Sequence, residues 1–82
     1  MKWFDWKTEQ VKRLESAGID YPEDELIYIL SVLNEKARSN IYFDKEIEVS
    51  EALSEDVLLR FEKILSGRIR REPLAYLLGE VF

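Results

Sequence analysis

One helical pattern decides the fold of this chain: SEDVLLRFEKILSGRIRREP, residues 54–73. Its apolar residues recur with the spacing of one helix face; they are Val57, Leu58, Phe61, Ile64, Leu65 and Ile69. Ser54 suits an N-cap, because its hydroxyl can accept a hydrogen bond from a free N–H of the first turn. Pro73 ends the pattern, since the residue before a proline avoids helical geometry. The stretch predicts a long amphipathic helix in which Gly67 is a weak point, costing about 1 kcal/mol relative to alanine.

Upstream, a second amphipathic helix is predicted over residues 3–17, with Gly18 as its left-handed C-terminal stop. Near one face of this helix fall Trp6, Gln10, Val11, Leu14 and Ala17. We interpret the aromatic cluster Trp3, Phe4 and Trp6 as core residues with a fraying end, in preference to a peptide-binding patch.

A third helix is predicted over residues 22–37. It begins at Pro22, whose missing N–H costs nothing at the first helical position. The acids Glu23, Asp24 and Glu25 fall in its first turn and are interpreted as charges that favour the positive helix end, in preference to metal ligands. Its apolar stripe is wide enough for a central helix and consists of Leu26, Ile29, Leu30, Leu33 and Ala37, broadened by Ile27, Tyr28 and Val32.

The remaining segments are short. Residues 39–43 suggest a short helix or turn. Residues 44–50 are predicted to form a loop over the core, because a lone strand there would have nothing to pair with. Residues 73–78 predict a short helix that Gly79 stops. We therefore expect a single all-α domain, residues 1–82, built as a small orthogonal bundle of about five helices.

Composition excludes several kinds of chemistry. The 82 residues include no cysteine and no histidine, so disulfides, thiolate nucleophiles and the commonest metal ligand are absent. Twelve basic and seventeen acidic residues give a net charge of −5, which disfavours direct binding to nucleic acid. No glycine-rich phosphate loop, secretory signal or membrane-spanning run is visible. We expect a cytoplasmic module with no membrane contact and no catalytic, cofactor-binding or metal-binding residue of its own.

Basic residues gather near the end of the long helix: Lys63, Arg68, Arg70 and Arg71. Cations there complement the helix dipole. They would equally serve as a docking patch for an acidic protein or a nucleic acid. A further interpretation is that Arg68 pairs with a carboxylate such as Glu25 and ties two helices together. The sequence leaves these interpretations open.

The C-terminal stretch RIRREPLAYLLGE, residues 68–80, resembles a family signature. It is similar to the end of the N-terminal domain of HemK-type (PrmC) release factor glutamine methyltransferases, where the pattern is Gly-x-Pro-Leu-x-Tyr-Leu-Leu-Gly-Glu. Residues 17–20, 22–25 and 53–55 resemble upstream parts of the same domain in the same order. Arg71 stands where the family has glycine, Glu25 where aspartate is usual, and residues 44–51 are longer and more acidic than typical.

The resemblance implies a methyltransferase that uses S-adenosylmethionine to methylate the glutamine in the Gly-Gly-Gln motif of peptide chain release factors. The family's cofactor turn and its Asn-Pro-Pro-Tyr motif do not occur in this sequence. We therefore expect this chain to be the leading substrate-recognition domain of a longer protein, inactive without the methyltransferase domain that follows. The candidate docking residues are Arg68, Arg70 and Arg71, and the candidate structural tie is Glu25 with Arg68.

Two other functions remain alternatives on the sequence alone. One is a free-standing helical adaptor that binds another protein. The other is a nucleic-acid-binding module that uses the arginines, which the net charge of −5 disfavours.

Overall fold

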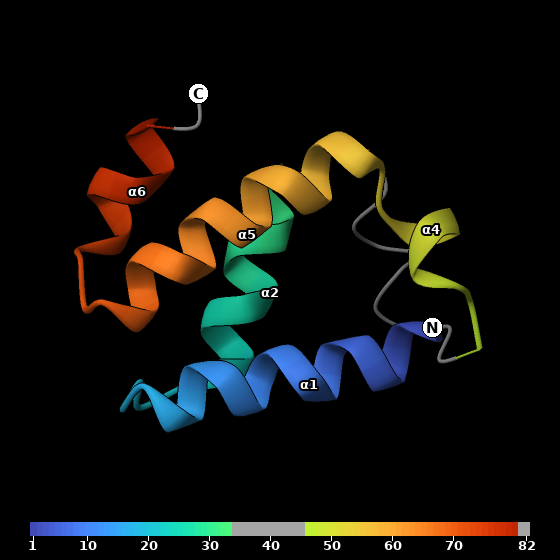
Figure 1. Ribbon diagram of the computed structural model, residues 1–82, viewed down its shortest axis with the longest axis horizontal. Helices are drawn as coiled ribbons and strands as arrows, with labels where there is room; N and C mark the ends of the chain where they lie inside the picture. The colour runs from blue at the N-terminus through green and yellow to red at the C-terminus, as the bar shows by residue number, and fades with distance from the viewer. Residues whose placement is uncertain (34–45, 81–82) are drawn as a thin grey trace.

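The structure, a computed structural model, describes residues 1–33 and 46–80. These residues form five helices and no strand: α1 (Trp3–Ser16), α2 (Pro22–Leu33), α4 (Val49–Ala52), α5 (Glu55–Ile69) and α6 (Leu74–Glu80) (Figure 1). The predicted all-α class is confirmed. The predicted end of the third helix, residues 34–37, and the predicted short helix or turn over 39–43 lie outside the described residues.

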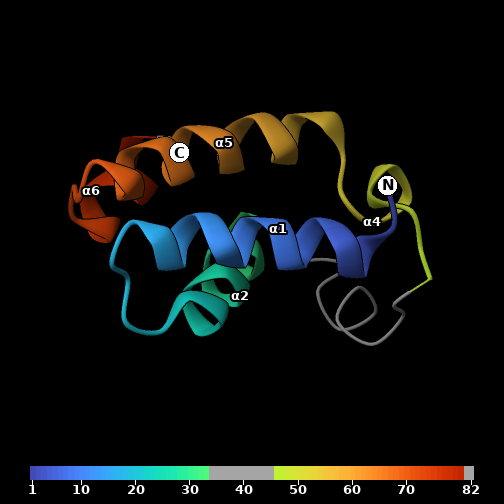
Figure 2. The same cartoon turned by 60° about the horizontal axis from the view of Figure 1, so that its bottom comes forward.

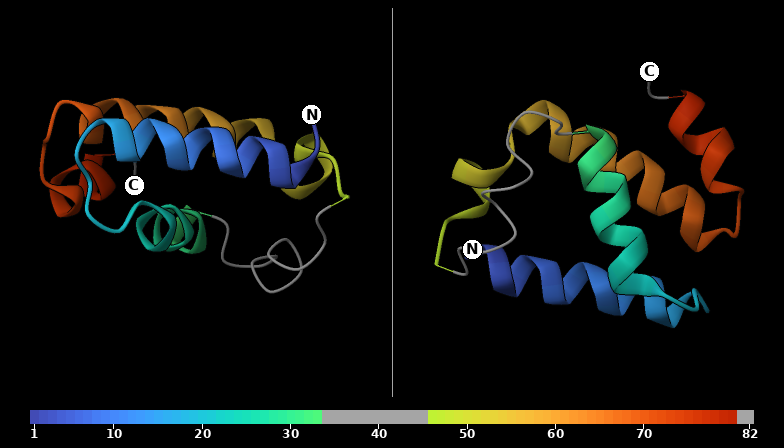
Figure 3. Two further views of the ribbon diagram at one scale, coloured as in Figure 1. Left: turned by 90° about the horizontal axis from the view of Figure 1, so that it is seen from below. Right: turned by 180° about the vertical axis from the view of Figure 1, so that it is seen from behind.

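Helix α2 crosses the other two long helices at a steep angle (Figure 1). Helices α1 and α5 lie side by side and run in nearly the same direction, and α2 crosses behind both of them (Figure 1). Seen from below, α2 is viewed almost end-on while α1 and α5 are viewed from the side (Figure 3). Helix α6 lies at one end of the α1–α5 pair and α4 at the other (Figure 2). The arrangement is the orthogonal bundle that the sequence predicted.

The core lies between α1, α2 and α5. Its largest fully buried side chains are Trp3, Leu14, Leu26, Ile29, Leu30, Leu53, Phe61, Ile64 and Leu65. Each of them contributes about 1.5–3 kcal/mol by leaving water, which makes this cluster the main source of stability. The predicted apolar faces supply most of these residues. Two described residues of the predicted faces are exposed instead: Ile69, 40% exposed at the last position of α5, and Tyr28 of α2, 53% exposed.

Three predicted helix boundaries are confirmed. Helix α2 begins at Pro22. The Ser54 Oγ accepts a hydrogen bond from the Val57 N–H at 3.2 Å, so Ser54 is the N-cap of α5. Gly18 follows α1 with φ +86°, a conformation that costs glycine little and other residues more.

The aromatic cluster of α1 belongs to the core, as predicted. The rings of Trp3 and Trp6 stack with centroids 5.5 Å apart, and Trp6 contacts Phe61 of α5 with centroids 5.1 Å apart. The expectation of a fraying end is wrong, because the Trp3 N–H donates to the Ile47 carbonyl at 2.7 Å. Phe4 is the half-exposed member of the cluster.

The predicted loop over residues 44–50 is only partly correct. Lys2 and Glu48 form an isolated antiparallel bridge, so this segment does find a backbone partner at the N-terminus. The Val49 N–H donates to the Met1 carbonyl at 3.0 Å, and α4 begins at the same residue. Residues 44 and 45 lie outside the described part of the chain.

The glycines of the C-terminal third differ from expectation. Gly67 is a buried contact point, because a Cβ there would lie 2.8 Å from Leu77 Cδ1 and closer still to its Cδ2. Glycine at this position therefore lets α6 approach α5. Gly79 does not stop α6, which continues to Glu80.

None of the helices in the described part of the chain has the length and apolar character needed to span a membrane.

Candidate functional site

The three predicted docking arginines lie at the end of α5 and in the turn into α6. Helix α5 ends at Ile69, and Arg71 adopts φ +66°. The turn is closed by the Arg71 N–H, which donates to the Arg68 carbonyl at 2.8 Å, and by the Glu72 N–H, which donates to the Gly67 carbonyl at 3.0 Å. A left-handed turn therefore forms even though arginine replaces the family's glycine. Such a conformation costs a non-glycine residue about 1 kcal/mol or more.

The Arg71 side chain joins this turn to the end of α1. Its Nη1 donates to the Ala17 carbonyl at 3.1 Å and thereby satisfies a carbonyl at the C-terminus of that helix. The same guanidinium covers Gly18, where a Cβ would lie 2.8 Å from Nη1. Arg71 therefore compensates part of its backbone cost with a tertiary contact.

Arg68 and Glu25, the candidate structural tie, lie in direct contact. The Arg68 Nε donates to Glu25 Oε2 at 2.8 Å, and Nη2 donates to Oε1 at 3.1 Å. Their side chains are only 16% and 15% exposed, so this bidentate pair is largely shielded from water. Arg68 Nη1 also donates to the Glu72 carbonyl at 2.7 Å. One guanidinium thus links α5, α2 and the turn into α6.

Arg70 lies apart from the other two arginines. Its Nε donates to Glu72 Oε1 at 2.9 Å, and its side chain is 64% exposed. Arg68 and Arg71 line a depression on one side of the bundle, while Arg70 lines a groove on another. The three candidate docking residues therefore do not share one surface.

The depression on the Arg68 side has a volume of about 440 Å³ and lies between the α1–α2 connection and the end of α5. It is lined by Gly18, Ile19, Asp20, Tyr21, Asp24, Glu25, Tyr28, Arg68, Arg71 and Leu74. Tyr21 and Tyr28 are exposed at its rim, and its two arginines already bind protein acceptors. Its carboxylates without a partner among the described residues are Asp20 and Asp24, at the start of α2, where the helix dipole favours them.

The groove on the Arg70 side has a volume of about 810 Å³ and follows the outer face of α5. It is lined by Asp56, Leu59, Arg60, Glu62, Lys63, Ser66, Arg70 and Leu77. The sequence did not predict this groove. The sequence feature that could have indicated it is Leu59, a large apolar residue outside the apolar stripe of α5. In the structure its side chain is 63% exposed.

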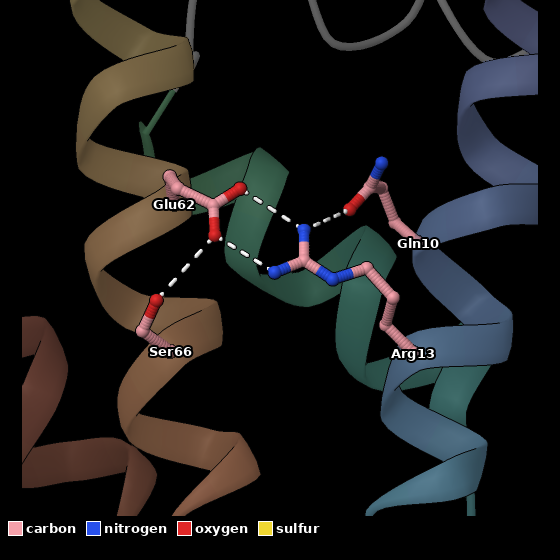
Figure 4. Close-up of polar contacts among 4 residues, drawn as sticks. All are labelled: Gln10, Arg13, Glu62 and Ser66. Atoms are coloured by element: carbon pink, nitrogen blue, oxygen red, sulfur yellow. Dashed lines mark hydrogen bonds and ion pairs between the residues drawn. The ribbon is translucent and has the colours of Figure 1, made fainter.

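A hydrogen-bonded network braces α5 against α1 beside this groove (Figure 4). Arg13 Nη1 and Nη2 donate to the two carboxylate oxygens of Glu62 at 3.0 and 2.9 Å. Gln10 Oε1 accepts from Arg13 Nη1 at 2.9 Å, and the Ser66 hydroxyl donates to Glu62 at 3.4 Å. The hydrogen bonds between Arg13 and Glu62 raise the pKa of the guanidinium and lower the pKa of the carboxyl group.

These surfaces carry charged and apolar groups of the kinds found at protein interfaces. Guanidinium, ammonium, carboxylate and phenol groups line them beside exposed leucine and tyrosine side chains. In residues 1–33 and 46–80, no group of three or more acidic side chains could hold a metal ion. The arrangement can recognise a protein surface by charge and by apolar contact.

A family model and a curated relative both connect this chain to methyltransferases. The family described as the PrmC N-terminal domain matches residues 5–79, which include Glu25 and the three arginines. The chain is 34% identical over 67 residues to a bifunctional methyltransferase of Rickettsia typhi. These residues make up 82% of this chain and 12% of that relative, so the chain spans only a small part of its length. No solved structure matches the chain significantly.

Proposed function

Because the chain belongs to the PrmC N-terminal domain family, we propose that it is the substrate-recognition domain of a protein methyltransferase. The proposed substrate is the glutamine of the Gly-Gly-Gln motif in peptide chain release factors. The methyl donor would be S-adenosylmethionine, bound by a methyltransferase domain that follows this one.

The family match over residues 5–79 carries the proposal. The match includes the stretch EPLAYLLG, residues 72–79, which lies in the turn after α5 and in helix α6. The relative from Rickettsia typhi is a methyltransferase of which this chain matches 12%, and that fraction suits a module attached to a larger enzyme.

A separate recognition domain has a physical purpose in this reaction. A glutamine side-chain amide is a weak nucleophile, so methyl transfer depends on precise orientation of the substrate. The Gly-Gly-Gln motif offers little side-chain surface, and selecting it among other glutamines requires contacts elsewhere on the substrate protein. A rigid helical bundle with charged and apolar surfaces supplies such contacts.

The test is methylation of a purified release factor by the longer protein that carries this domain, measured by mass spectrometry of the Gly-Gly-Gln peptide. We expect one added methyl group on the glutamine, dependent on S-adenosylmethionine. We also expect titration calorimetry to detect binding of the release factor to the 82-residue chain. Absence of methylation with an intact cofactor-binding domain would contradict the proposal.

A further inference from the structure

We propose that the groove between α5 and α6 receives an acidic amphipathic helix of the substrate protein. This inference rests on the proposed function and adds to it the docking surface and the chemistry of the segment that docks there.

The groove presents one row of side chains along the outer face of α5, which continues to the C-cap Arg70. Leu59, Lys63, Ser66 and Arg70 follow each other at i, i+4, i+7 and i+11, so they form a ridge on the helix surface opposite the core. Leu77 of α6 is 4% exposed and forms the apolar floor. The groove exists because Gly67 lets α6 approach α5 at one end. A ridge beside an apolar floor is a surface onto which another helix packs.

The charges of the groove favour an acidic ligand. Asp56 is neutralised by Arg60 at 3.1 Å, and Glu62 is neutralised by Arg13 from α1. Lys63 is exposed and forms no ion pair with the described residues. The groove therefore keeps a surplus positive charge on a chain whose net charge is −5.

Arg70 is paired with Glu72 and contributes hydrogen-bond donors to the groove. Only its Nε is used, in the bond to Glu72, and its terminal nitrogens make no hydrogen bond to the described residues. A guanidinium with two free terminal nitrogens can bind a carboxylate with planar geometry. By contrast, Arg68 and Arg71 in the opposite depression use their terminal nitrogens for contacts within the domain.

Besides acidic groups, the ligand needs an apolar side chain, because Leu59 is exposed in the groove. It lies one turn before Lys63 and is 63% exposed. A partner that buries Leu59 while pairing with Lys63 needs an apolar residue about one helical turn from an acidic one. That spacing is the pattern of an acidic amphipathic helix.

The test compares two exposed lysines that form no ion pair with the described residues. Lys63→Glu changes the groove, whereas Lys12→Glu makes the same charge change on α1, outside the groove. Binding of the 82-residue chain is measured with a release factor and with a synthetic helical peptide that carries one row of leucines and one of glutamates. Leu59→Glu serves as a second groove variant. Circular dichroism confirms that all variants fold.

We expect Lys63→Glu and Leu59→Glu each to weaken binding of both ligands by about tenfold, because a like charge or a lost apolar contact faces the ligand. Lys12→Glu should leave both affinities unchanged, and added salt should weaken binding to the wild-type chain. If the release factor binds all four proteins equally, the inference is wrong while the proposed function stands.

If the release factor binds none of them, the proposed function is wrong. Binding of the synthetic peptide then tests separately whether the groove accepts an acidic helix. Binding of the peptide to the wild-type chain but not to Lys63→Glu would then support an acidic-helix site. Failure of the peptide to bind the wild-type chain would overturn that site as well.

Discussion

Arg71 connects two helix ends with a single side chain. Its backbone takes a left-handed conformation after α5, and its guanidinium binds the carbonyl of Ala17 at the end of α1. The two features have opposite effects on the stability of the fold. The left-handed backbone lowers it, and the hydrogen bond to Ala17 raises it. Two substitutions can separate them.

Arg71→Ala keeps the strained backbone and loses the contact with Ala17, so we expect the free energy of unfolding to fall by about 1 kcal/mol. Arg71→Gly loses the same contact but relieves the strain, so its stability should lie about 1 kcal/mol above that of Arg71→Ala. Urea unfolding followed by tryptophan fluorescence measures both. If the alanine variant is as stable as the glycine variant, the positive φ carries no cost.

Arg68 has the most protected ion pair among the described residues, with both side chains about one-sixth exposed. Arg68→Met keeps the aliphatic length but leaves the largely buried carboxylate of Glu25 without its cation. We expect the free energy of unfolding to fall by about 2 kcal/mol.

Arg70→Met is the matched control for Arg68→Met, because Arg70 is exposed and its pair with Glu72 is solvated. It should change stability by about 0.5 kcal/mol or less. Thermal unfolding of both variants checks this. Equal losses in the two proteins would show that burial does not strengthen the pair of Arg68 with Glu25.

At the scale of elements, the packing of α6 on α5 depends on the lack of a side chain at Gly67. The nearest atoms belong to Leu77, which is 4% exposed and has little room to move. Gly79 provides a contrast, since it lies within α6 with nothing within 4 Å of a built Cβ.

We expect Gly67→Ala to destabilise the protein by about 1–2 kcal/mol, because crowding of Leu77 outweighs the gain in helix propensity. Gly79→Ala should stabilise it by about 0.5 kcal/mol, since only the propensity term changes. Chemical unfolding of the two variants measures whether each substitution raises or lowers the free energy of unfolding. A stabilised Gly67→Ala would mean that α6 does not pack closely at this point.

At the scale of the whole molecule, α1 and α5 are joined by an ion pair that responds to acid. The pKa of Glu62 is lowered by its hydrogen bonds to Arg13. Because the folded-state pKa lies below the unfolded-state value, the contribution of this pair is complete above the ordinary carboxyl pKa of 4.5. It is lost as the pH falls through the lower folded-state pKa.

Wild-type stability should therefore fall from pH 5 to pH 3, a range of about two units around the carboxyl pKa. Glu62→Gln should be less stable than the wild type at pH 7, and the difference should shrink in acid. Glu48, whose pKa is lowered by the N-terminal ammonium and Lys2, adds to the same trend in both proteins. A difference that is constant with pH would exclude the carboxylate as its source.

Local features of the sequence determined the three long helices, α1, α2 and α5, but not α4 or the end of α6. The periodic apolar residues of α5, the N-cap at Ser54, Pro22 at the start of α2 and Gly18 after α1 act within one or two helical turns, so reading along the chain was sufficient. The family signature was equally readable because it is contiguous.

Only the tertiary structure decided which distant groups meet. Arg68 finds Glu25 across 43 positions, and Arg13 finds Glu62 across 49, among many acids of similar local context. The division of the arginines between two surfaces and the role of Gly67 as a contact point depend on how each helix is rotated and crossed. Those angles are set by simultaneous packing of several helix faces, which no single stretch of sequence contains.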